Sequence, residues 1–318
     1  PALSPSFYQA ADLAGQYPET FADIRDLEAV KNSMTVADPE VIIHMAAQPL
    51  VRASYADPIE TYGTNVLGTA HVLEAARSCR NLRAILVITT DKVYRNDENP
   101  AGYREEDPLG GDDPYSASKA CAEFVSASYR ASFFSEADRP LIATARAGNV
   151  IGGGDWAENR LIPDCVRYLN KNQKIVVRNP NAIRPWQHVF EPISGILLLA
   201  YNMKQNPTKF NEPWNIGPNS SNMTVKEVIE KVIEKWRNGS WEELHCNEPD
   251  FHEANILKLD SSKIQNKLNW RQCLTIDEAI DYTIQWYKKF TEKNINMFDF
   301  SIEQIKSYIT KANLSNIQ

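Results

Sequence analysis

Three short apolar runs constrain the fold of this chain more than any other feature. They cover residues 38–47, 82–90 and 141–147, and each is built mainly from β-branched residues, leucine and alanine. Runs of this length, bounded by polar or proline-containing segments, are typical of strands buried on both faces of a parallel sheet. In such sheets ligands bind beyond the carboxyl ends of the strands. The residues that end the second run, Thr90-Asp91-Lys92, therefore lie where a ligand would bind.

Helix signals lie between these runs. Asp57-Pro58 opens a segment that we expect to be helical through about Arg77, and Asp113-Pro114 opens another helix. Aspartate is a favoured cap, and proline suits the first turn because an N–H there has no helical partner. Strands that alternate with helices predict an α/β fold with right-handed crossovers. After about residue 150 the alternation is less regular, and we expect helices near 159–171, 191–204, 224–237, 275–290 and 301–311.

The composition is that of an ordinary globular protein. At 318 residues, with 43% hydrophobic and 24% charged residues, the chain can bury a sizeable core. Its net charge of −7 argues against nucleic acid or an anionic membrane as the main partner. No apolar run approaches the roughly 18–20 residues of a membrane span. The five cysteines are scattered without a Cys-x-x-Cys pair, which predicts a cytoplasmic protein with reduced thiols.

Tyr115 and Lys119 stand four residues apart at the start of the helix that follows Asp113-Pro114. That spacing puts both side chains on one face of the helix, one turn apart. A lysine cation near a phenol favours the ionised phenolate, which can act as a base near neutral pH. The pair alone is a weak signal, because the same spacing arises often on the surface of an amphipathic helix.

Thr90-Asp91-Lys92 strengthens that signal. An Asp-Lys pair in a loop is more often a solvated turn, but here it ends a buried strand in a chain that also carries the Tyr115 motif. The two groups can serve as acid and base only with shifted pKa values, since at neutral pH aspartate is normally ionised and lysine protonated. We therefore interpret Tyr115, Lys119 and the triplet as one catalytic group.

No glycine-rich phosphate loop of the form GxGxxG or GxxGxxG occurs in the chain. A complete dinucleotide-binding fold places that loop in a β-α-β unit of roughly 30 or more residues ahead of the runs described above. The alternating strands and helices predict an α/β fold with a Rossmann-type doubly wound parallel sheet. Because the glycine-rich loop is absent, we expect the first strands of that sheet to be missing from this chain. A smaller α/β substrate-binding lobe is expected beside the sheet.

Several segments together carry a resemblance to a known family. They are residues 23–26, 44–52, 64–69, 89–94, 113–119, 146–156 and 184–189. Through them the chain resembles the extended short-chain dehydrogenases/reductases, and among these the NAD-dependent nucleotide-sugar dehydratases of the CDP-glucose 4,6-dehydratase type. Lys92 points to that branch, because related dTDP-glucose dehydratases carry glutamate in its place. Val93 departs from the branch, which often has cysteine there.

The resemblance implies an internal redox cycle on CDP-glucose. Tyr115 would take the C4 hydroxyl proton while a hydride passes from C4 to NAD, and the new ketone acidifies the C5 proton. Lys92 would remove that proton and Asp91 would protonate the departing C6 hydroxyl, with the order of roles in this pair left open. Return of the hydride to C6 would give CDP-4-keto-6-deoxyglucose for deoxysugar and polysaccharide synthesis. Thr90 would hydrogen-bond the 4-oxygen, and Lys119 would hold the nicotinamide ribose.

The resemblance also implies residues that hold the two ligands. Cofactor contacts would come from Asp23, Ile24, Ala46, Ala47, Gln48, Tyr115 and Lys119. Substrate contacts would come from Asn65, Asn149, Arg160, Arg178, Arg184, His188 and His252. Asn65 could equally be a buried structural amide, and Arg184 part of an ordinary ion pair. No metal site is expected, because the His245-Cys246 and His252-Glu253 pairs fit no standard zinc spacing.

The expected domains follow from the same resemblance. We expect a NAD-binding domain over residues 1–150 and about 185–212, and a nucleotide-sugar-binding lobe over about 151–184 and 213–318. By resemblance the protein is a homodimer paired through the helices near 57–77 and 113–133. One alternative is a 4-epimerase or another nucleotide-sugar dehydratase of the same fold. The other is a truncated, non-catalytic product unable to bind NAD.

Overall fold

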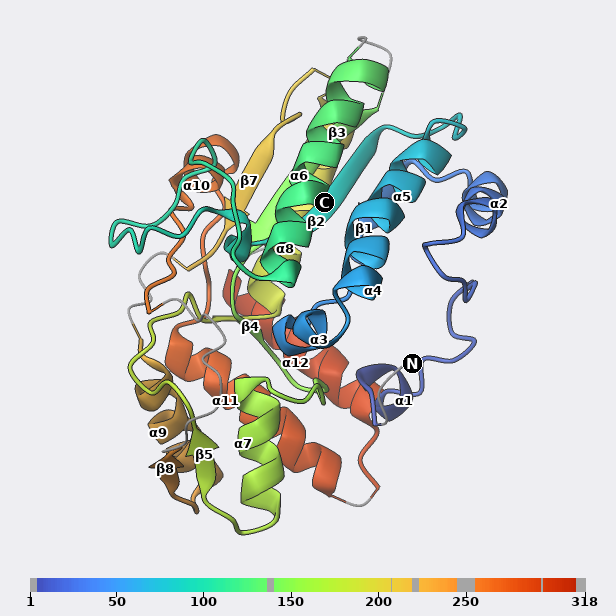
Figure 1. The fold of residues 1–318 in the computed structure, drawn as a ribbon. Helices are drawn as coiled ribbons and strands as arrows, with labels where there is room; N and C mark the ends of the chain where they lie inside the picture. Colours follow the sequence, from blue (N-terminus) through green and yellow to red (C-terminus); the bar gives the residue numbers. More distant parts are fainter. Residues whose placement is uncertain are drawn as a thin grey trace.

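The computed structural model describes residues 5–135, 140–206, 208–218, 223–244, 255–292 and 294–312. A parallel sheet with its helices fills one half of the molecule, and a smaller part with helices and short ladders fills the other (Figure 1). No helix within the described ranges is long and apolar enough to span a membrane.

The main sheet has four parallel strands in the order β1-β2-β3-β7. They are β1 Val41–His44, β2 Ala84–Thr90, β3 Leu141–Ala147 and β7 Pro213–Ile216. The three strands expected from the apolar runs are therefore confirmed. β2 and β3 are buried along almost their whole length, which explains why their sequences show no alternation of polar and apolar residues.

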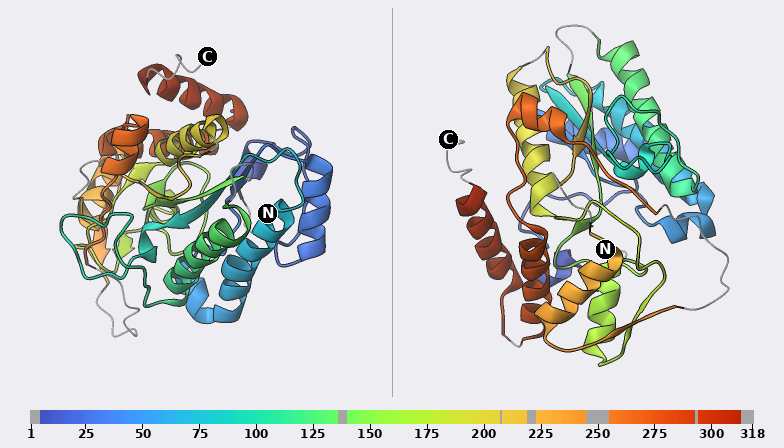
Figure 2. Two further views of the ribbon diagram at one scale, coloured as in Figure 1. Left: turned by 90° about the horizontal axis from the view of Figure 1, so that it is seen from above. Right: turned by 90° about the vertical axis from the view of Figure 1, so that its left-hand side faces the viewer.

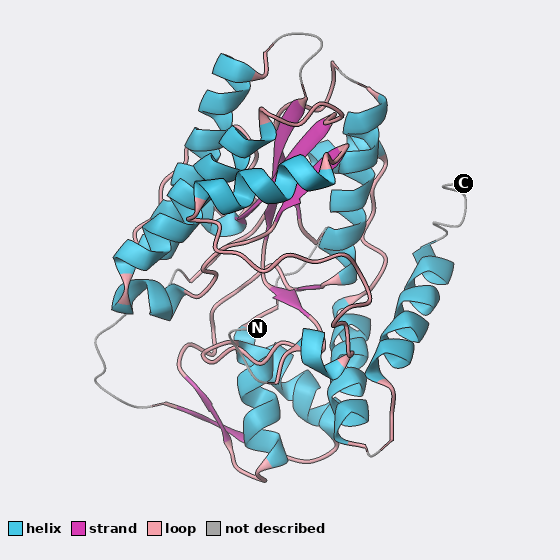
Figure 3. Ribbon diagram, turned by 90° about the vertical axis from the view of Figure 1, so that its right-hand side faces the viewer, coloured by secondary structure: helices cyan, strands magenta, loops and turns pink. Residues whose placement is uncertain are grey.

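Helices cover both faces of this sheet (Figure 3), so the expected doubly wound α/β fold is confirmed. Side chains of β2 alternate between the faces: Ala84 and Leu86 pack with helix α8, whereas Ile85 and Val87 pack with helix α5. That alternation follows from the two-residue period of a strand. One face is covered by α2 Leu27–Ala37, α5 Gly68–Ala76 and α6 Pro114–Phe133, and the other by α8 Phe190–Gln205 and α10 Ser262–Leu268.

Both predicted helix starts are confirmed. The side chains of Asp57 and Asp113 each accept a hydrogen bond from a backbone N–H in the first turn, at 2.9 Å. The first of these helices is not uniform, because a π-helical turn, η1 Gly63–Leu67, joins α4 Pro58–Tyr62 to α5. A π turn carries an extra residue and frequently lies at a functional site. This one carries Asn65.

The smaller part combines helices with two short parallel ladders. Its core combines aliphatic and aromatic side chains: Trp286 and Tyr287 are buried, and the Trp286 and Phe290 rings stack with centroids 5.6 Å apart. The five helices expected after residue 150 all form, with α8 as the member that covers the main sheet. The elements are β4 Val150–Ile151 paired with β6 Gln187–His188, β5 Ile175–Val177 paired with β8 Trp241–Glu243, and α7 Leu161–Asn170, α9 Val225–Trp236, α11 Ile276–Thr291 and α12 Met297–Ala312.

The two parts are connected at places that the sequence did not indicate. β7 lies at the start of the expected second lobe, yet it pairs with β3 in the main sheet, and α10 packs on β7 and α8. In the smaller part, the Phe7 ring of α1 Phe7–Ala10 stacks on Trp286 with centroids 5.8 Å apart. Helix α12 lies on the outside of the molecule in both views of Figure 2, where the Tyr308 hydroxyl donates to Glu191 of α8 at 3.0 Å.

Candidate active site

A cavity of about 1130 Å³ opens at the carboxyl ends of β2 and β3. Its wall includes Thr90, Asp91, Lys92 and Tyr115 of the predicted catalytic group. Much of the rest of the wall comes from the segment after β3, from α7 and β5, and from helix α3 Val51–Ala56. The cavity therefore lies between the main sheet and the smaller part, at the strand ends where the sequence predicted a ligand.

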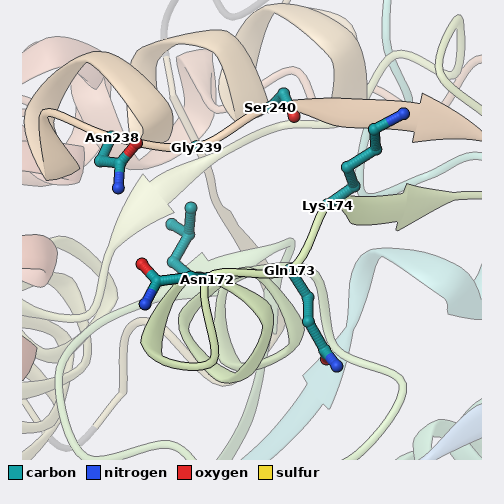
Figure 4. A pocket seen from close by; sticks show the side chains of 7 residues that line it. Asn172, Gln173, Lys174, Asn238, Gly239 and Ser240 are labelled. Atoms are coloured by element: carbon teal, nitrogen blue, oxygen red, sulfur yellow. The ribbon is translucent and has the colours of Figure 1, made fainter.

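A second cavity, of about 220 Å³, lies between the turn after α7 and the turn that joins α9 to β8 (Figure 4). Its wall is made mostly of amide and small residues. The one charged side chain is Lys174, which pairs with Glu242 at 3.0 Å. The seven lining residues include no carboxylate, thiol, imidazole or phenol, so this cavity offers no acid–base pair.

Helix α6 positions Tyr115 and Lys119. The backbone N–H of Tyr115 donates to the Ser54 hydroxyl at 3.1 Å, which fixes the first turn of the helix against α3. The Tyr115 side chain shares a hydrogen bond with that of Thr90, and Lys119 Nζ donates to the Ile88 carbonyl at 3.1 Å. Both side chains are buried; Tyr115 lines the large cavity, whereas Lys119 is not part of its wall.

Burial shifts the pKa of both groups. It raises the pKa of Tyr115 to about 12, although the hydrogen bond with Thr90 opposes it, and it lowers the pKa of Lys119 to about 8 against the charge of Glu123. The expected lowering of the Tyr115 pKa by Lys119 is therefore not found, because Lys119 is directed to the Ile88 carbonyl and burial dominates.

Thr90, Asp91 and Lys92 lie where β2 passes into a single 3-10 turn, η2 Asp91–Val93. The Thr90 hydroxyl donates to Asp91 Oδ1 at 2.9 Å and accepts from the Lys92 N–H at 3.4 Å. Asp91 Oδ2 is buried without a hydrogen-bond partner in the described part of the chain. Burial raises the pKa of Asp91 although the Lys92 charge opposes it. The carboxyl thus favours the protonated form that a general acid needs.

Gly148, just after β3, forms the wall behind the Asp91 carboxyl. A Cβ at this glycine would lie 2.3 Å from Asp91 Oδ2 and 2.6 Å from Pro185 Cγ. The segment is fastened by Gln187, whose Nε2 donates to the Gly148 carbonyl at 3.2 Å and to the Ile216 carbonyl at 2.9 Å. The carboxyl therefore occupies a slot that only glycine leaves open.

Six of the seven residues predicted to bind the cofactor lie outside the wall of the large cavity, and Tyr115 is the one that lines it. The six are Asp23, Ile24, Ala46, Ala47, Gln48 and Lys119. Asp23 is exposed and pairs with Arg25 at 2.6 Å, which lowers the pKa of Asp23 to about 2. Ile24 packs so closely on α5 that a Cβ at Gly68 would lie 2.5 Å from Ile24 Cδ1. Ala46 and Ala47 follow β1, the first exposed and the second half-buried. Their cofactor roles stay predictions.

Gln48 and Asn65 fasten the end of β1 to helix α6. The Gln48 N–H donates to Asn65 Oδ1 at 2.8 Å, and Asn65 Nδ2 donates to the Gln48 carbonyl at 3.0 Å and to Ser118 Oγ at 2.8 Å. Asn65 is 1% exposed, and both of its amide hydrogens are used inside the protein. These contacts favour the alternative of a buried structural amide, which holds the strand end against the helix of Tyr115; a role of Asn65 in substrate binding stays a prediction.

Four other predicted substrate ligands, Asn149, Arg160, Arg178 and Arg184, line the large cavity. Arg184 is buried and donates to the Asn255 carbonyl at 3.3 Å, while Arg160 pairs with Asp155 at 3.5 Å. Guanidinium groups suit phosphate oxygens because their planar donors match them in pairs. The structure thus brings together three arginines on a wall that could hold a diphosphate.

The structure describes one of the two predicted histidine ligands, His188. His188 is buried between the rings of Phe190 and Tyr282, at centroid distances of 4.4 and 5.7 Å, and it is not part of the cavity wall. Burial lowers the pKa of His188 to about 3, so it is a neutral core side chain here, and its role in substrate binding stays a prediction. His252 lies outside the described residues.

Two cavity residues were missed by the sequence analysis. Glu98 Oε1 accepts from the backbone N–H of Asn255 at 2.9 Å and from its side-chain amide at 3.0 Å, and both residues line the large cavity. They are 157 positions apart in the chain. No local spacing could have joined them, because the contact depends on how the loop after η2 meets the smaller part.

Comparison with known proteins gives these features a context. The model of the GDP-mannose 4,6 dehydratase family matches residues 7–283. The CDP-glucose 4,6-dehydratase of Salmonella typhimurium is 44% identical over 312 residues, covering 96% of this chain and 86% of that protein. The dTDP-glucose 4,6-dehydratase of Bacillus anthracis, solved in complex with NAD, is 25% identical, with a TM-score of 0.73 over 87% of this chain and 81% of that one. The Streptomyces venezuelae dTDP-glucose 4,6-dehydratase, solved with NAD and TYD, is 22% identical, with a TM-score of 0.76 over 87% and 82%.

Proposed function

The chain belongs to the GDP-mannose 4,6 dehydratase family, and from this premise we propose that it converts CDP-glucose into CDP-4-keto-6-deoxyglucose. The reaction oxidises C4, eliminates water across C5 and C6, and returns the hydride to C6. The choice of CDP-glucose rests on the Salmonella typhimurium relative, which is 44% identical to this chain.

The buried Asp91 carboxyl is the observation that carries the proposal. A tyrosine and a lysine suffice to exchange a hydride and a proton at C4, but loss of the C6 hydroxyl needs an additional acid. Asp91 lies in the same cavity as Tyr115, has an unpartnered Oδ2 among the described atoms, and has a raised pKa. This arrangement favours dehydration over epimerisation.

Each polar group of the site has one task in this proposal. Tyr115 accepts the C4 hydroxyl proton, and Thr90 donates a hydrogen bond to the C4 oxygen as charge develops there. Asp91 protonates the C6 hydroxyl, which leaves as water. Lys92, the next residue on the same turn, accepts the C5 proton. The two protons that move during elimination therefore pass through one short turn at the end of β2.

NAD is the cofactor that we infer. The nicotinamide end fits the residues present: Lys119 uses one Nζ hydrogen on the Ile88 carbonyl and has others for ribose hydroxyls, one helical turn from the Tyr115 phenol. When bound, NAD supplies the acceptor and later the donor of the hydride. The sequence contains no glycine-rich phosphate loop. The fit therefore concerns the nicotinamide and its ribose.

The arginine wall is the proposed site of the substrate diphosphate. Arg184, Arg160 and Asn149 offer donors to the phosphate oxygens, and exposed Arg178 adds positive charge. Glu98 and Asn255 already hydrogen-bond to each other on this wall. They extend its polar surface beyond the reacting carbons.

We also propose a homodimer that works in the cytoplasm. Ile59, Leu67 and Phe124 project from α4, η1 and α6 and are 80%, 59% and 61% exposed, and exposed apolar groups gathered on neighbouring helices are typical of an interface. The four described cysteines are free thiols, as expected in a reducing compartment. The ketone product suits a reductase or an aminating enzyme on the way to polysaccharide sugars.

For the two lobes we propose the boundaries expected from the sequence, with one change that concerns β7 and α10. The NAD-binding lobe comprises residues 1–150 and about 185–212 together with β7 and α10, because both pack in the main sheet layer. The nucleotide-sugar lobe comprises about 151–184 and the remaining C-terminal residues. The large cavity between them is then the place where cofactor and sugar meet.

Purified protein incubated with NAD and, in parallel, CDP-, dTDP-, UDP- and GDP-hexoses tests the proposal. Mass spectrometry of the nucleotide sugars is the readout. We expect loss of one water from CDP-glucose and much slower loss from the others. An isomer of unchanged mass would indicate an epimerase, and water loss only from another nucleotide sugar would overturn the choice of substrate.

A further inference from the structure

A buried ion pair lies directly behind the catalytic helix and has no part in the reaction proposed above. Glu123 follows Lys119 by one turn of α6, and its carboxylate accepts from Arg146 of β3, through Nε at 2.9 Å and NH2 at 3.0 Å. The two side chains are 3% and 2% exposed. Removing two charges from water is costly, so such a pair is stable only when its remaining hydrogen bonds are completed.

Two threonines, one on β2 and one on β3, complete the hydrogen bonds of the Glu123 carboxylate. Thr89 of β2 donates to Oε1 at 2.6 Å and Thr144 of β3 donates to Oε2 at 2.7 Å. Burial alone would raise the pKa of Glu123, but the hydrogen bonds and charge of Arg146 outweigh it and hold the pKa below its usual range. Glu123 is therefore ionised and fastens α6 to β2 and β3.

Arg146 extends the network to the turn that carries Asp91. Its NH1 donates to the Tyr94 hydroxyl at 2.8 Å and to the Glu105 carbonyl at 3.1 Å. Tyr94 follows η2 directly, and its hydroxyl donates to Asn215 of β7 at 2.6 Å. One buried network thus reaches the Lys119 helix and the Asp91 turn.

We propose that Glu123 and Arg146 are positioning residues that act through Lys119. The pair fixes the catalytic helix against the strand that ends in Thr90. The Glu123 charge helps Lys119 hold its proton, and Arg146 balances that charge through its two hydrogen bonds to the Glu123 carboxylate. The inference rests on the proposed function, in which Lys119 assists oxidation at C4.

Several other charged and titratable groups lie around Lys119 and the Glu123–Arg146 pair. His44 is neutral, because burial and then the Lys119 charge lower its pKa to about 4. Burial lowers the pKa of Arg130 while the Glu123 charge opposes it, and burial together with the Asp91 charge raises the pKa of Tyr115. The described groups that surround the pair are His44 of β1, Asp91 of η2, Arg146 of β3, and Tyr115, Glu123 and Arg130 of α6.

Removing the charge of Glu123 and removing the charge of Arg146 should shift the alkaline limb of the kcat–pH profile in opposite directions. Burial lowers the pKa of Lys119 to about 8 while Glu123 opposes it, so the alkaline limb of kcat reports loss of the Lys119 proton. Glu123→Gln keeps the shape but leaves Arg146 unbalanced, and the limb moves to lower pH by about one unit. Arg146→Met leaves Glu123 unbalanced, and the limb moves to higher pH. The double variant returns toward the wild-type profile.

The test is the kcat–pH profile of the NAD-loaded enzyme with CDP-glucose for wild type, both single variants and the double variant. Tyr94→Phe is the matched control, since it removes a hydrogen bond to Arg146 but leaves both charges, and its limb stays in place. Titration of the Lys119 ammonium by nuclear magnetic resonance of lysine-labelled protein, assigned by comparison with Lys119→Met, follows the same proton without turnover. Its midpoint falls in Glu123→Gln and rises in Arg146→Met.

Shifts of opposite sign support the proposal. A uniform loss of kcat in both variants, with unmoved limbs and unmoved Lys119 midpoints, would show a merely structural pair and overturn the proposal. If Arg146→Met does not fold, the nearly isosteric Glu123→Gln decides alone by the direction of its shift. If wild-type protein does not dehydrate CDP-glucose, the proposed function fails, while the Lys119 titration still tests this inference.

Discussion

Replacement of Gly148 by alanine tests the tight slot around Asp91. The new Cβ would lie 2.3 Å from Asp91 Oδ2, whereas ordinary contacts begin near 3.4 Å, so the carboxyl or Pro185 must move by roughly 1 Å. A displacement of that size at a reacting group costs about 100-fold in rate. We expect kcat on CDP-glucose to fall about 100-fold while KM changes little, because the arginine wall is untouched.

Gly195→Ala in α8 is the matched control for the added methyl group. Its Cβ would lie 2.9 Å from Ile216 Cγ2, away from the reacting groups. Overpacking of this kind costs about 1–3 kcal/mol in a core, so both variants should lose stability in guanidinium unfolding. Only Gly148→Ala should lose activity. A kcat within threefold of wild type, or equal losses in both variants, would refute the reasoning about the Asp91 slot.

Three further changes have defined outcomes. Tyr115→Phe should lower kcat by about 100-fold or more with little change in the affinity for CDP-glucose measured by calorimetry, and near-normal turnover would contradict its role as base. Burial raises the pKa of Asp91 in the folded protein, so wild-type stability is lost as pH rises through that pKa. At neutral pH, Asp91→Asn should therefore have a larger free energy of unfolding than wild type, and the difference should shrink below about pH 4. A difference between variant and wild type that is the same at both pH values would contradict this reasoning. Phe124→Glu should convert the dimer to monomer in sedimentation experiments, whereas Val36→Glu, at a site that is 89% exposed on α2, should not; a dimeric Phe124→Glu would exclude the α6 interface.

The sequence predicted the parts of the fold that depend on local pattern. The strands at 82–90 and 141–147 follow from continuous apolar runs, and the caps at Asp57 and Asp113 follow from residues whose side chains bond the first helical turn. β7 was not recognised, because four residues beginning with proline give too short a pattern to distinguish from a loop.

In the site, too, only the residues that depend on local pattern were predicted from the sequence. Tyr115 and the Thr90-Asp91-Lys92 turn were predicted, because a helical spacing and a strand end can be read from short segments. Asn65 and His188 were assigned to the substrate by resemblance, and only burial and hydrogen bonds show that they hold the protein together. The Glu123–Arg146 pair was missed, since nothing in the sequence indicates which buried charges meet across β3.

The most direct test of the account follows one hydrogen through the reaction. CDP-glucose labelled with deuterium at C4 is incubated with the purified enzyme and NAD, and the product is analysed by nuclear magnetic resonance. The account predicts that one water is lost per substrate and that the C4 deuterium appears at C6 of the 4-keto-6-deoxy sugar. Deuterium retained at C4, or released to solvent without transfer to C6, would contradict it.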